Sequence, residues 1–512
     1  MENSQRKMSM WSLVLMIFAA IYGLGNTTVG FYQMGYGAML WYVLGALFFF
    51  IPSSLMFAEY GSALQDSQGG IYSWLQASIG EKPAFIGTFI WYAAWVIWLV
   101  TNFSTISVSI SGAIFGRDTT QSWHLFGLTS NQTLGLIGIT LLVFATFVST
   151  RGFDKIEKIA SFCGTFIIGV AIFFLIVSAI YLVVVHGHLA QPLTTQSMVR
   201  SPNPAFGSPI ALMSFFVYAV FAYGGMETMG STIDKVKDPD KNFPRGIIIA
   251  AIGMIVIYCI GVLAWGVTAN WHRVLSGSNV DLGNITLVLM SNLGYSIAHT
   301  LLHTSVATAK IWGLWADRII GIEEIFSIFG AIFILIYSPL KTMIIGTPQR
   351  LWPTKLTKLN EHGMPATAMW LQTIMVVLII LGVSFGGKSA QAFYTVLQDM
   401  NNVTTSVPYL FLIAAFPFFK KRHDLERPFE IYTNRALTTT VSFISWTTVF
   451  MGIVFTVIQP LLQHDLYTAF WTVFGPVFFG IVGWSFYSLA GYRQRHRTAT
   501  GIPVAEELNS ND

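Results

Sequence analysis

The sequence predicts an all-α polytopic membrane protein with twelve transmembrane helices. Of its 512 residues, 54% are hydrophobic and only 10% are charged, whereas a soluble globular chain carries about 25% charged residues. Twelve apolar segments each approach the roughly 20 residues that a helix needs to cross a bilayer. Lys and Arg residues gather in alternate loops between these segments, which is typical of a multi-pass membrane chain.

The expected spans follow one another from the N-terminus, with bounds set to within a few residues. They lie near residues 11–33, 38–60, 85–114, 132–150, 158–185, 208–232, 246–269, 320–346, 366–385, 391–418, 437–460 and 468–490. Arg6 and Lys7 precede the first span, which is too long for a signal peptide and lacks a small-residue cleavage site after it. One transmembrane domain therefore fills residues 1–512, and the polar tail 498–512 is expected to be disordered.

The basic residues predict the orientation. With the N-terminus in the cytoplasm, the cytoplasmic segments carry most of the 28 Lys and Arg residues, as membrane proteins generally do. The opposite side carries only Arg117, Arg200, Arg273, Lys310, Arg318 and Lys388. We therefore expect a cytoplasmic (inner) membrane protein with both termini in the cytoplasm. The outer loop 271–317 has two short apolar stretches, which we expect to form surface helices. An extra span there would put the C-terminus outside the cell, and the basic residues would then no longer lie mostly on the cytoplasmic side.

Residues 221–227, F-A-Y-G-G-M-E, lie inside the apolar run 209–231. Gly224 and Gly225 each cost roughly 1 kcal/mol relative to Ala in a helix interior. An ionised Glu227 in mid-membrane costs at least ~2.5 kcal/mol. The pattern predicts a helix broken near the membrane centre, where backbone groups and one acid line a cavity.

A second break is predicted at residues 20–28, A-I-Y-G-L-G-N-T-T. The two stretches align without gaps, since Tyr22 and Tyr223 each precede a glycine and a polar residue follows four positions after each tyrosine. Paired glycine-interrupted spans in two halves of a chain are typical of a transporter binding site. Packing between helices explains the glycines alone, but it does not require the polar residues.

Two broken helices that face each other suit a zwitterion. A half-helix N-terminus presents free N–H groups to a carboxylate, and the opposite half-helix end presents carbonyls to an ammonium. Gly23 and Gly25 allow close backbone approach, and Asn26 and Thr27 add short polar groups. The expected ligand is a free amino acid or an amine. Phe221 could close over it as a gate, or could be an ordinary packing residue among 41 Phe.

Several acids lie in or near the expected spans. Glu227 is a candidate for proton or cation coupling, because intramembrane acids default to function; capping the broken helix is its alternative role. Glu59 is expected near the cytoplasmic interface, in a structural or gating role. Glu323 and Glu324 are expected near the outer mouth, in contact with water.

Three further polar residues are candidates for lining the transport pathway. Asp399 and Asn402 share a helical face in the tenth expected span, and Asn102 lies in the third. The alternative is that they join helices by hydrogen bonds. The sequence leaves these two interpretations equal.

Other function classes find no support in the sequence. There is no G-x-x-x-x-G-K-[ST] phosphate loop and no Ser/His/Asp arrangement. Cys163 and Cys259 both fall in apolar runs, without metal-ligand spacing. A net charge of +4 does not indicate nucleic-acid binding. We expect no enzyme activity, no cofactor and no metal.

Several motifs resemble the amino acid–polyamine–organocation transporter superfamily. They are Y-G-L-G-N (22–26), A-E-Y-G with G-G-I-Y-S-W-L (58–61 and 69–75), R-G-F-D-K-I-E-K (151–158), F-A-Y-G-G-M-E with D-P-D-K-N-F-P-R (221–227 and 238–245), and P-Q-R-L-W-P with H-G-M-P (348–353 and 362–365). Within it the chain looks most similar to the glutamate/γ-aminobutyrate antiporter family, and there to inner-membrane permeases of the YjeM type. F-Y-Q-M-G-Y (31–36), S-P-N-P (201–204) and D-L-E-R-P-F (424–429) carry this closer match.

The resemblance implies two inverted five-helix repeats, about 11–185 and 208–418, with broken helices one and six as in the LeuT-like fold, plus two extra helices at 437–490. It implies a substrate α-carboxyl at the break after Gly23, an amine at the carbonyls around 221–224, Phe221 as gate and Glu227 as the acid of helix six. The substrate-binding residues expected on this basis are Tyr22, Gly23, Gly25, Asn26, Thr27, Phe221, Ala222, Tyr223 and Gly224.

Three features depart from the family pattern. The tail after Arg497 is too short for the C-terminal plug expected in glutamate/γ-aminobutyrate antiporters, so acid gating is not carried over. Some relatives carry a lysine in the middle of the fifth span, where its charge takes the place of a sodium ion. Residues 165–176 of this chain are uncharged, which leaves the coupling ion open. Pro348 and Pro353 interrupt the loop after the eighth span.

The function expected is secondary active transport of amino acids by alternating access, as an antiporter. The alternatives are a proton- or sodium-coupled symporter of neutral amino acids and a nutrient sensor that does not transport. The expected partners are an amino acid and the lipid bilayer, with no nucleic acid, and the chain is expected to act as a monomer or homodimer. The sequence does not identify the amino acid.

Overall fold

The computed structural model describes residues 7–67, 69–277, 280, 282, 284–386, 388–462, 464 and 466–499, without the side chains of 388–402, 459, 468 and 491–499. The helices of the first half are α1 (Met10–Ile21), α2 (Leu24–Met34), α3 (Gly37–Gly45), η1 (Ala46–Phe50), α4 (Ile51–Ala63), α5 (Ile71–Ile79), α6 (Glu81–Phe115), η2 (Thr120–Ser122), α7 (Ser130–Ser149), α8 (Phe153–Val184), α9 (Thr195–Val199), η3 (Pro204–Phe206), α10 (Pro209–Phe221) and η4 (Met226–Lys235).

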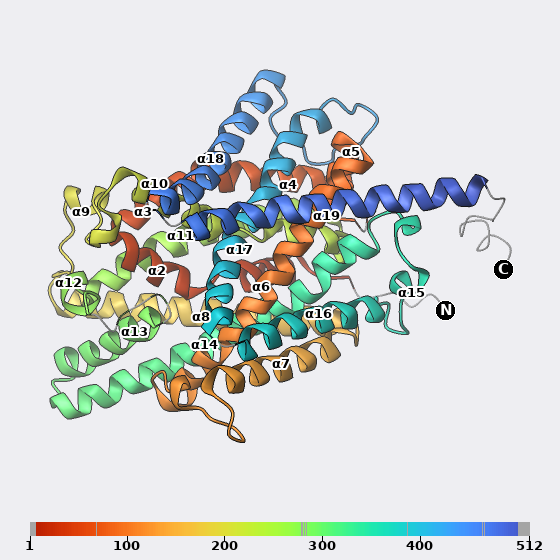
Figure 1. The fold of residues 1–512 in the computed structure, drawn as a ribbon. Coiled ribbons are helices and arrows are strands. Elements are labelled where there is room, and N and C mark those ends of the chain that lie inside the picture. The colour runs from red at the N-terminus through yellow and green to blue at the C-terminus, as the bar shows by residue number, and fades with distance from the viewer. Residues whose placement is uncertain are drawn as a thin grey trace.

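The second half is also helical throughout its described part. It comprises α11 (Pro239–Thr268), α12 (Trp271–Val274), α13 (Ile285–Ser296), η5 (Ile297–Leu301), α14 (Val306–Ile344), η6 (Gln349–Leu351), α15 (Thr354–Thr357), α16 (Ala366–Phe385), α17 (Lys388–Phe419), α18 (Arg435–Leu462) and α19 (Leu466–Ala499). Figure 1 shows α9, α12 and α13 at one end of the bundle and α5 and α15 at the other.

Ten helices of the described chain are long and apolar enough to cross a membrane, or eleven when the bent pair α1 and α2 counts as one span. These correspond in order to eleven of the twelve expected segments. The remaining segment, 391–418, falls on α17, whose side chains are described only from Val403 onward. The all-helical membrane architecture predicted from composition is therefore confirmed, while the number twelve stays a prediction.

The loop expected between residues 271 and 317 is largely helical. Its two apolar stretches form the helices α13 and η5, and α14 begins at Val306 rather than near residue 320. Much of α13 is buried, so its expected place on the surface stays a prediction. Ser305 caps α14, since its hydroxyl accepts from the amide of Thr308 at 3.2 Å. Gly294 of α13 lies against Trp312 of α14, so close packing between the two helices extends α14 beyond the expected span.

Ionic contacts tie α4 to the connection between α17 and α18. Glu59 is fully buried, and its carboxylate accepts from Lys420 Nζ at 2.9 Å and from the amide of Ile431 at 2.9 Å. Arg427 Nε lies 3.7 Å from the same carboxylate. Because a buried carboxylate needs such partners, this arrangement fits a structural role for Glu59 better than contact with a ligand.

Small residues let the long helices approach closely. A Cβ at Gly164 of α8 would lie 2.2 Å from the carbonyl oxygen of Leu15 on α1. A Cβ at Gly138 of α7 would lie 2.0 Å from the carbonyl oxygen of Phe103 on α6. Backbone atoms cannot move aside as a flexible side chain can, so these glycines fix the distance between their helices.

Replacing Gly164 with Ala is expected to lower the unfolding temperature of the protein, because the added Cβ forces α1 and α8 apart. Overpacking of this kind costs about 1–3 kcal/mol. The measurement is thermal unfolding of purified protein in detergent, followed by intrinsic fluorescence.

Gly169→Ala is the matched control on the same helix. Nothing lies within 4 Å of a Cβ at that position, and Ala favours a helix by roughly 1 kcal/mol over Gly. Equal unfolding temperatures for the two variants would contradict the close approach of α1 to α8.

Candidate functional site

The first predicted break separates α1 from α2. The two helices are bent by 42°, and Gly23 precedes α2 with an extended backbone, φ −134° and ψ 134°. Among the described residues, no side chain caps the first amides of α2. The N-terminus of a helix carries unpaired N–H groups and a partial positive charge, so this end is suited to a carboxylate.

The second predicted break separates α10 from η4. The amide of Gly224 donates to the carbonyl of Phe221 at 2.9 Å, which closes a turn at the end of α10. Gly225 has φ +121°, a backbone conformation that residues with a Cβ rarely adopt. The chain can therefore turn from α10 into η4 within one span because glycine stands at this position.

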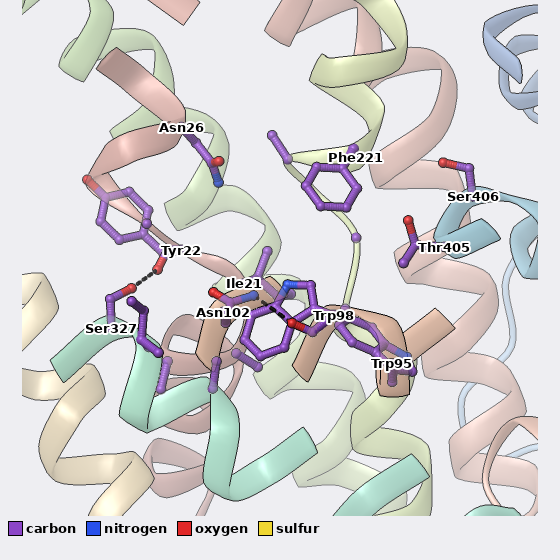
Figure 2. A pocket seen from close by; sticks show the side chains of 18 of the residues that line it. Ile21, Tyr22, Asn26, Trp95, Trp98, Asn102, Phe221, Ser327, Thr405 and Ser406 are labelled. Atoms are coloured by element: carbon purple, nitrogen blue, oxygen red, sulfur yellow. Dashed lines mark hydrogen bonds between the residues drawn. The ribbon is translucent and has the colours of Figure 1, made fainter. Parts of the chain in front are cut away.

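A cavity of about 200 Å³ lies between the two breaks. Figure 2 shows part of its lining, with Phe221 and Asn26 facing the space above the Trp95 and Trp98 rings. The lining residues are Ala19, Ala20, Ile21, Tyr22, Gly23, Asn26, Trp95, Trp98, Asn102, Phe221, Ala222, Gly224, Gly225, Ser327, Ile328, Ala331, Thr405, Ser406 and Tyr409. They come from both broken helices and from α6, α14 and α17.

The described lining contains no ionisable acid or base other than tyrosine. Its polar groups are amides and hydroxyls, and its apolar surface is dominated by aromatic rings; Trp95 and Trp98 meet edge to face at 6.0 Å. In the part of the chain that the structure describes, no three His, Cys, Asp or Glu side chains are placed to hold a metal ion. The cavity is suited to a small solute without a large unbalanced charge.

Tyr258 of α11 joins the two breaks. Its hydroxyl donates to the carbonyl of Ala222 at 2.8 Å and accepts from Asn26 Nδ2 at 2.8 Å. Tyr218 donates to Asn26 Oδ1 at 3.1 Å, and the ring of Tyr22 stacks on that of Tyr258 at 5.6 Å. The side chain of Asn26 is therefore held by two tyrosines as well as lining the cavity.

Glu227 lies beside the cavity and caps the second break. It is 2% exposed, and its carboxylate accepts from the amide of Gly225 at 3.1 Å and from Trp91 Nε1 at 3.0 Å. Tyr409 also donates to it, while the hydroxyl of Tyr409 accepts from Gly225 at 2.8 Å. This geometry is the capping role that the sequence offered as an alternative; the coupling role stays a prediction.

The cavity brings together seven of the residues singled out from the sequence: Tyr22, Gly23, Asn26, Asn102, Phe221, Ala222 and Gly224. Glu227, described above, lies outside its lining, as do three others of that set. Thr27 accepts from Trp265 Nε1 at 2.9 Å, Tyr223 donates to the carbonyl of Tyr42 at 3.3 Å, and Gly25 faces Thr286. The side chains of Asp399 and Asn402 lie outside the described residues.

The expectation that Glu323 contacts water is wrong, because that side chain is 1% exposed. Glu324 is partly exposed, and its carboxylate accepts hydrogen bonds from Ser109 and Thr286. Both lie well inside α14, because that helix starts earlier than expected and α6 and α13 pack against it.

Sequence reasoning missed several lining residues. Trp95 and Trp98 lie seven and four positions before Asn102, so helical spacing could have placed all three on one face. Tyr409 likewise follows Ser406 by three positions. Ser327 and Ala331 carried no such signal, because only the packing of α14 against the breaks brings them to the cavity. Tyr258 lies outside the lining, and no local pattern predicted that it joins the two breaks.

A helical membrane bundle with two interrupted spans around one cavity has the architecture of a secondary transporter. The chain belongs to the amino acid permease family, whose model matches residues 8–486. It is 45% identical over 488 residues to the inner membrane transporter YjeM of Salmonella typhimurium, covering 95% of this chain and 97% of that protein. It is 42% identical to the YjeM of Escherichia coli K12, with the same coverage.

A more distant relative is the glutamate/gamma-aminobutyrate antiporter of Lactococcus lactis subsp. lactis. It is 24% identical over 407 residues, covering 79% of this chain and 74% of the relative. The resemblance expected from the sequence motifs is thus confirmed across nearly the whole chain.

Replacing Tyr258 with Phe is expected to lower the stability of the protein by about 1–3 kcal/mol, because it leaves the carbonyl of Ala222 and the amide of Asn26 without their partner. The measurement is thermal unfolding in detergent. Tyr467→Phe is the control, since that side chain is 55% exposed. A Tyr258→Phe protein as stable as the control would show that the bridge between the breaks contributes nothing.

Proposed function

We propose that the protein is a secondary active transporter that exchanges amino acids across the cytoplasmic membrane. The observation that carries this is the cavity between two broken helices, with free N–H groups at one break and backbone carbonyls at the other. The family supports transport of amino acids, and the relative named a glutamate/gamma-aminobutyrate antiporter supports exchange as the mode.

The substrate α-carboxylate binds at the N-terminus of α2, after Gly23, where no side chain occupies the first amides. The ammonium group binds at carbonyls of the second break. The carbonyls of Phe221 and Ala222 already accept one hydrogen bond each, and a carbonyl oxygen has a second lone pair for the ammonium. Phe221 closes over the bound substrate.

Alternating access needs one end of the cavity to be closed while the other is open. Beyond η4, the amide of Met8 donates to the carbonyl of Lys235 at 2.7 Å, and Lys237 donates to the carbonyl of Met8 at 2.9 Å. Lys341 of α14 pairs with Asp234 at 2.9 Å. These contacts must separate if the cavity is to open toward the end of the bundle that carries α15.

We place both termini in the cytoplasm, following the distribution of basic residues. The proposed topology has twelve spans, with inverted repeats at about 11–185 and 208–418 and two further helices at about 437–490, in one transmembrane domain that acts as a monomer or homodimer. The correspondence of the two breaks, one in each repeat, supports this arrangement.

A second candidate is symport of neutral amino acids with a cation. The described lining favours it in one respect, because the cavity has no basic side chain to pair with the second carboxylate of glutamate. Exchange and symport then differ in whether uptake needs a partner substrate inside the vesicle.

The test is uptake by purified protein in liposomes preloaded with one amino acid at a time. Glutamate, γ-aminobutyrate and neutral and basic amino acids are offered outside with a label. Uptake that appears only with a preloaded partner is the expected result. Uptake that needs an ion gradient but no partner identifies symport. Binding without movement of any amino acid overturns transport in favour of a sensor.

Replacing Ala331 with Leu is expected to reduce uptake at least tenfold, because the larger side chain fills part of a cavity of about 200 Å³. The measurement is initial uptake in liposomes at equal protein content. Ala414→Leu is the control, since Ala414 is exposed on α17 and the change in size is the same. Wild-type uptake by Ala331→Leu would place the substrate elsewhere.

A further inference from the structure

Helix α14 carries a buried carboxylate one turn from the cavity. Ser327 lines the cavity, and its hydroxyl donates to the carbonyl of Tyr22 at 3.3 Å. Glu323 precedes Ser327 by four residues, a rise of about 6 Å along a helix. Glu323 therefore lies beside the first break, toward the end of α14 at which the helix begins.

Glu323 has no partner for its charge among the described residues. It is 1% exposed, and neither carboxylate oxygen has a hydrogen-bond donor in the described part of the chain. An ionised carboxylate in such surroundings lacks both water and donors, so the neutral acid is strongly favoured.

The groups that face Glu323 do not supply a positive charge. Its neighbour Glu324 is an acid, bonded to Ser109 of α6 and Thr286 of α13. Tyr22 faces it from the end of α1, with Tyr258 of α11 behind that ring. Arg318 precedes Glu323 by five residues on α14. Its side chain donates to the carbonyls of Ile114 and Leu314 and stacks on the ring of Trp315.

Asp317 lies between this pair of acids and the start of α14. It is 5% exposed, its Oδ1 has no partner in the described chain, and Ser291 bonds to the side chain. Asp317 and Glu324 are seven residues apart, which places them on one face of the helix. Glu324 adjoins Glu323 in the chain, and Glu323 shares a helix face with Ser327 four residues on, so the acids lead from Asp317 through Glu324 and Glu323 to the cavity.

We propose that Glu323 is the proton-binding site of this transporter, and that Asp317 passes protons to it from the end of the bundle where α14 begins. This rests on the proposed function. An O–H bond of a hydronium ion breaks as its proton bonds to one carboxylate oxygen, which leaves a water molecule and a neutral acid. Glu323 releases the proton when movement at Tyr22 and Ser327 admits water, so proton release accompanies reorientation of the cavity.

A proton fits this site better than a metal ion. The described residues offer no cluster of three or more metal-type side chains, and a proton needs only one carboxylate oxygen. Glu227 is the rival for the same role, but donors from Gly225, Trp91 and Tyr409 already stabilise its ionised form.

The direct test is infrared spectroscopy of the full chain in lipid, which detects the carbonyl stretch of a protonated carboxylic acid without any substrate. At neutral pH, the wild-type spectrum minus that of Glu323→Gln is expected to contain this band. Glu361→Gln is the matched control, since that side chain is 85% exposed. Absence of the band from the Glu323→Gln difference would overturn the proposal, whether or not the protein transports.

A second variant, Glu324→Gln, tests the proposal if Glu323→Gln does not fold. Removing a neighbouring negative charge makes ionised Glu323 less unfavourable, so Glu324→Gln is expected to lose the Glu323 acid band at a lower pH than wild type, over a titration from about pH 5 to 9. An unchanged or raised pH would contradict a proton held at Glu323.

Transport assays distinguish a loss of proton coupling from a loss of substrate binding. With the same amino acid at equal concentration on both sides, Glu323→Gln is expected to exchange within about twofold of wild type, while accumulation driven by an imposed pH gradient falls at least tenfold. Glu323→Asp keeps a carboxyl group and is expected to restore much of that response. A Glu323→Gln protein that still accumulates substrate with the pH gradient overturns the coupling role.

Discussion

Backbone groups that two interrupted helices leave unpaired inside an apolar bundle are the constraint on which the rest of the structure depends. Each missing turn frees N–H and C=O groups that lipid cannot satisfy. The carbonyl of Ala222 is met by Tyr258, and the amide of Gly225 by Tyr409 and Glu227. The positions of α11 and α17 against the breaks follow from these bonds.

The groups that remain open after this pairing define the site. At the first break, Gly23 offers no side chain to the amides that begin α2, and the cavity opens directly beside it. The described walls supply amides, hydroxyls and aromatic faces. A zwitterion brings its own pair of opposite charges to such a site, so the protein needs no charged side chain there to hold it.

Two buried acids near the breaks differ in their surroundings, and this difference suggests different roles. Glu227 accepts hydrogen bonds from three donors and closes the turn after α10, so its carboxyl group holds the conformation of the break. Glu323 has burial without donors. A protein that keeps such an acid beside a moving part has a group whose charge can change when that part moves.

The sequence alone determined the membrane class, the order of most spans and the position of both breaks. These are local properties: apolar length sets a span, and two glycines with a polar residue mark where a helix cannot continue. It also placed six cavity residues that belong to the breaks themselves, and Asn102 on α6.

Tertiary packing decided what surrounds the breaks. Asn26 and Tyr258 are 232 positions apart, and Glu227 and Tyr409 are 182 apart, so no local pattern links them. The burial of Glu323 depends on α6 and α13 lying against an α14 longer than its apolar core suggests. The sequence shows that position 323 carries a carboxylate, but it does not show whether water or protein surrounds that group. The packing of the helices determines its surroundings.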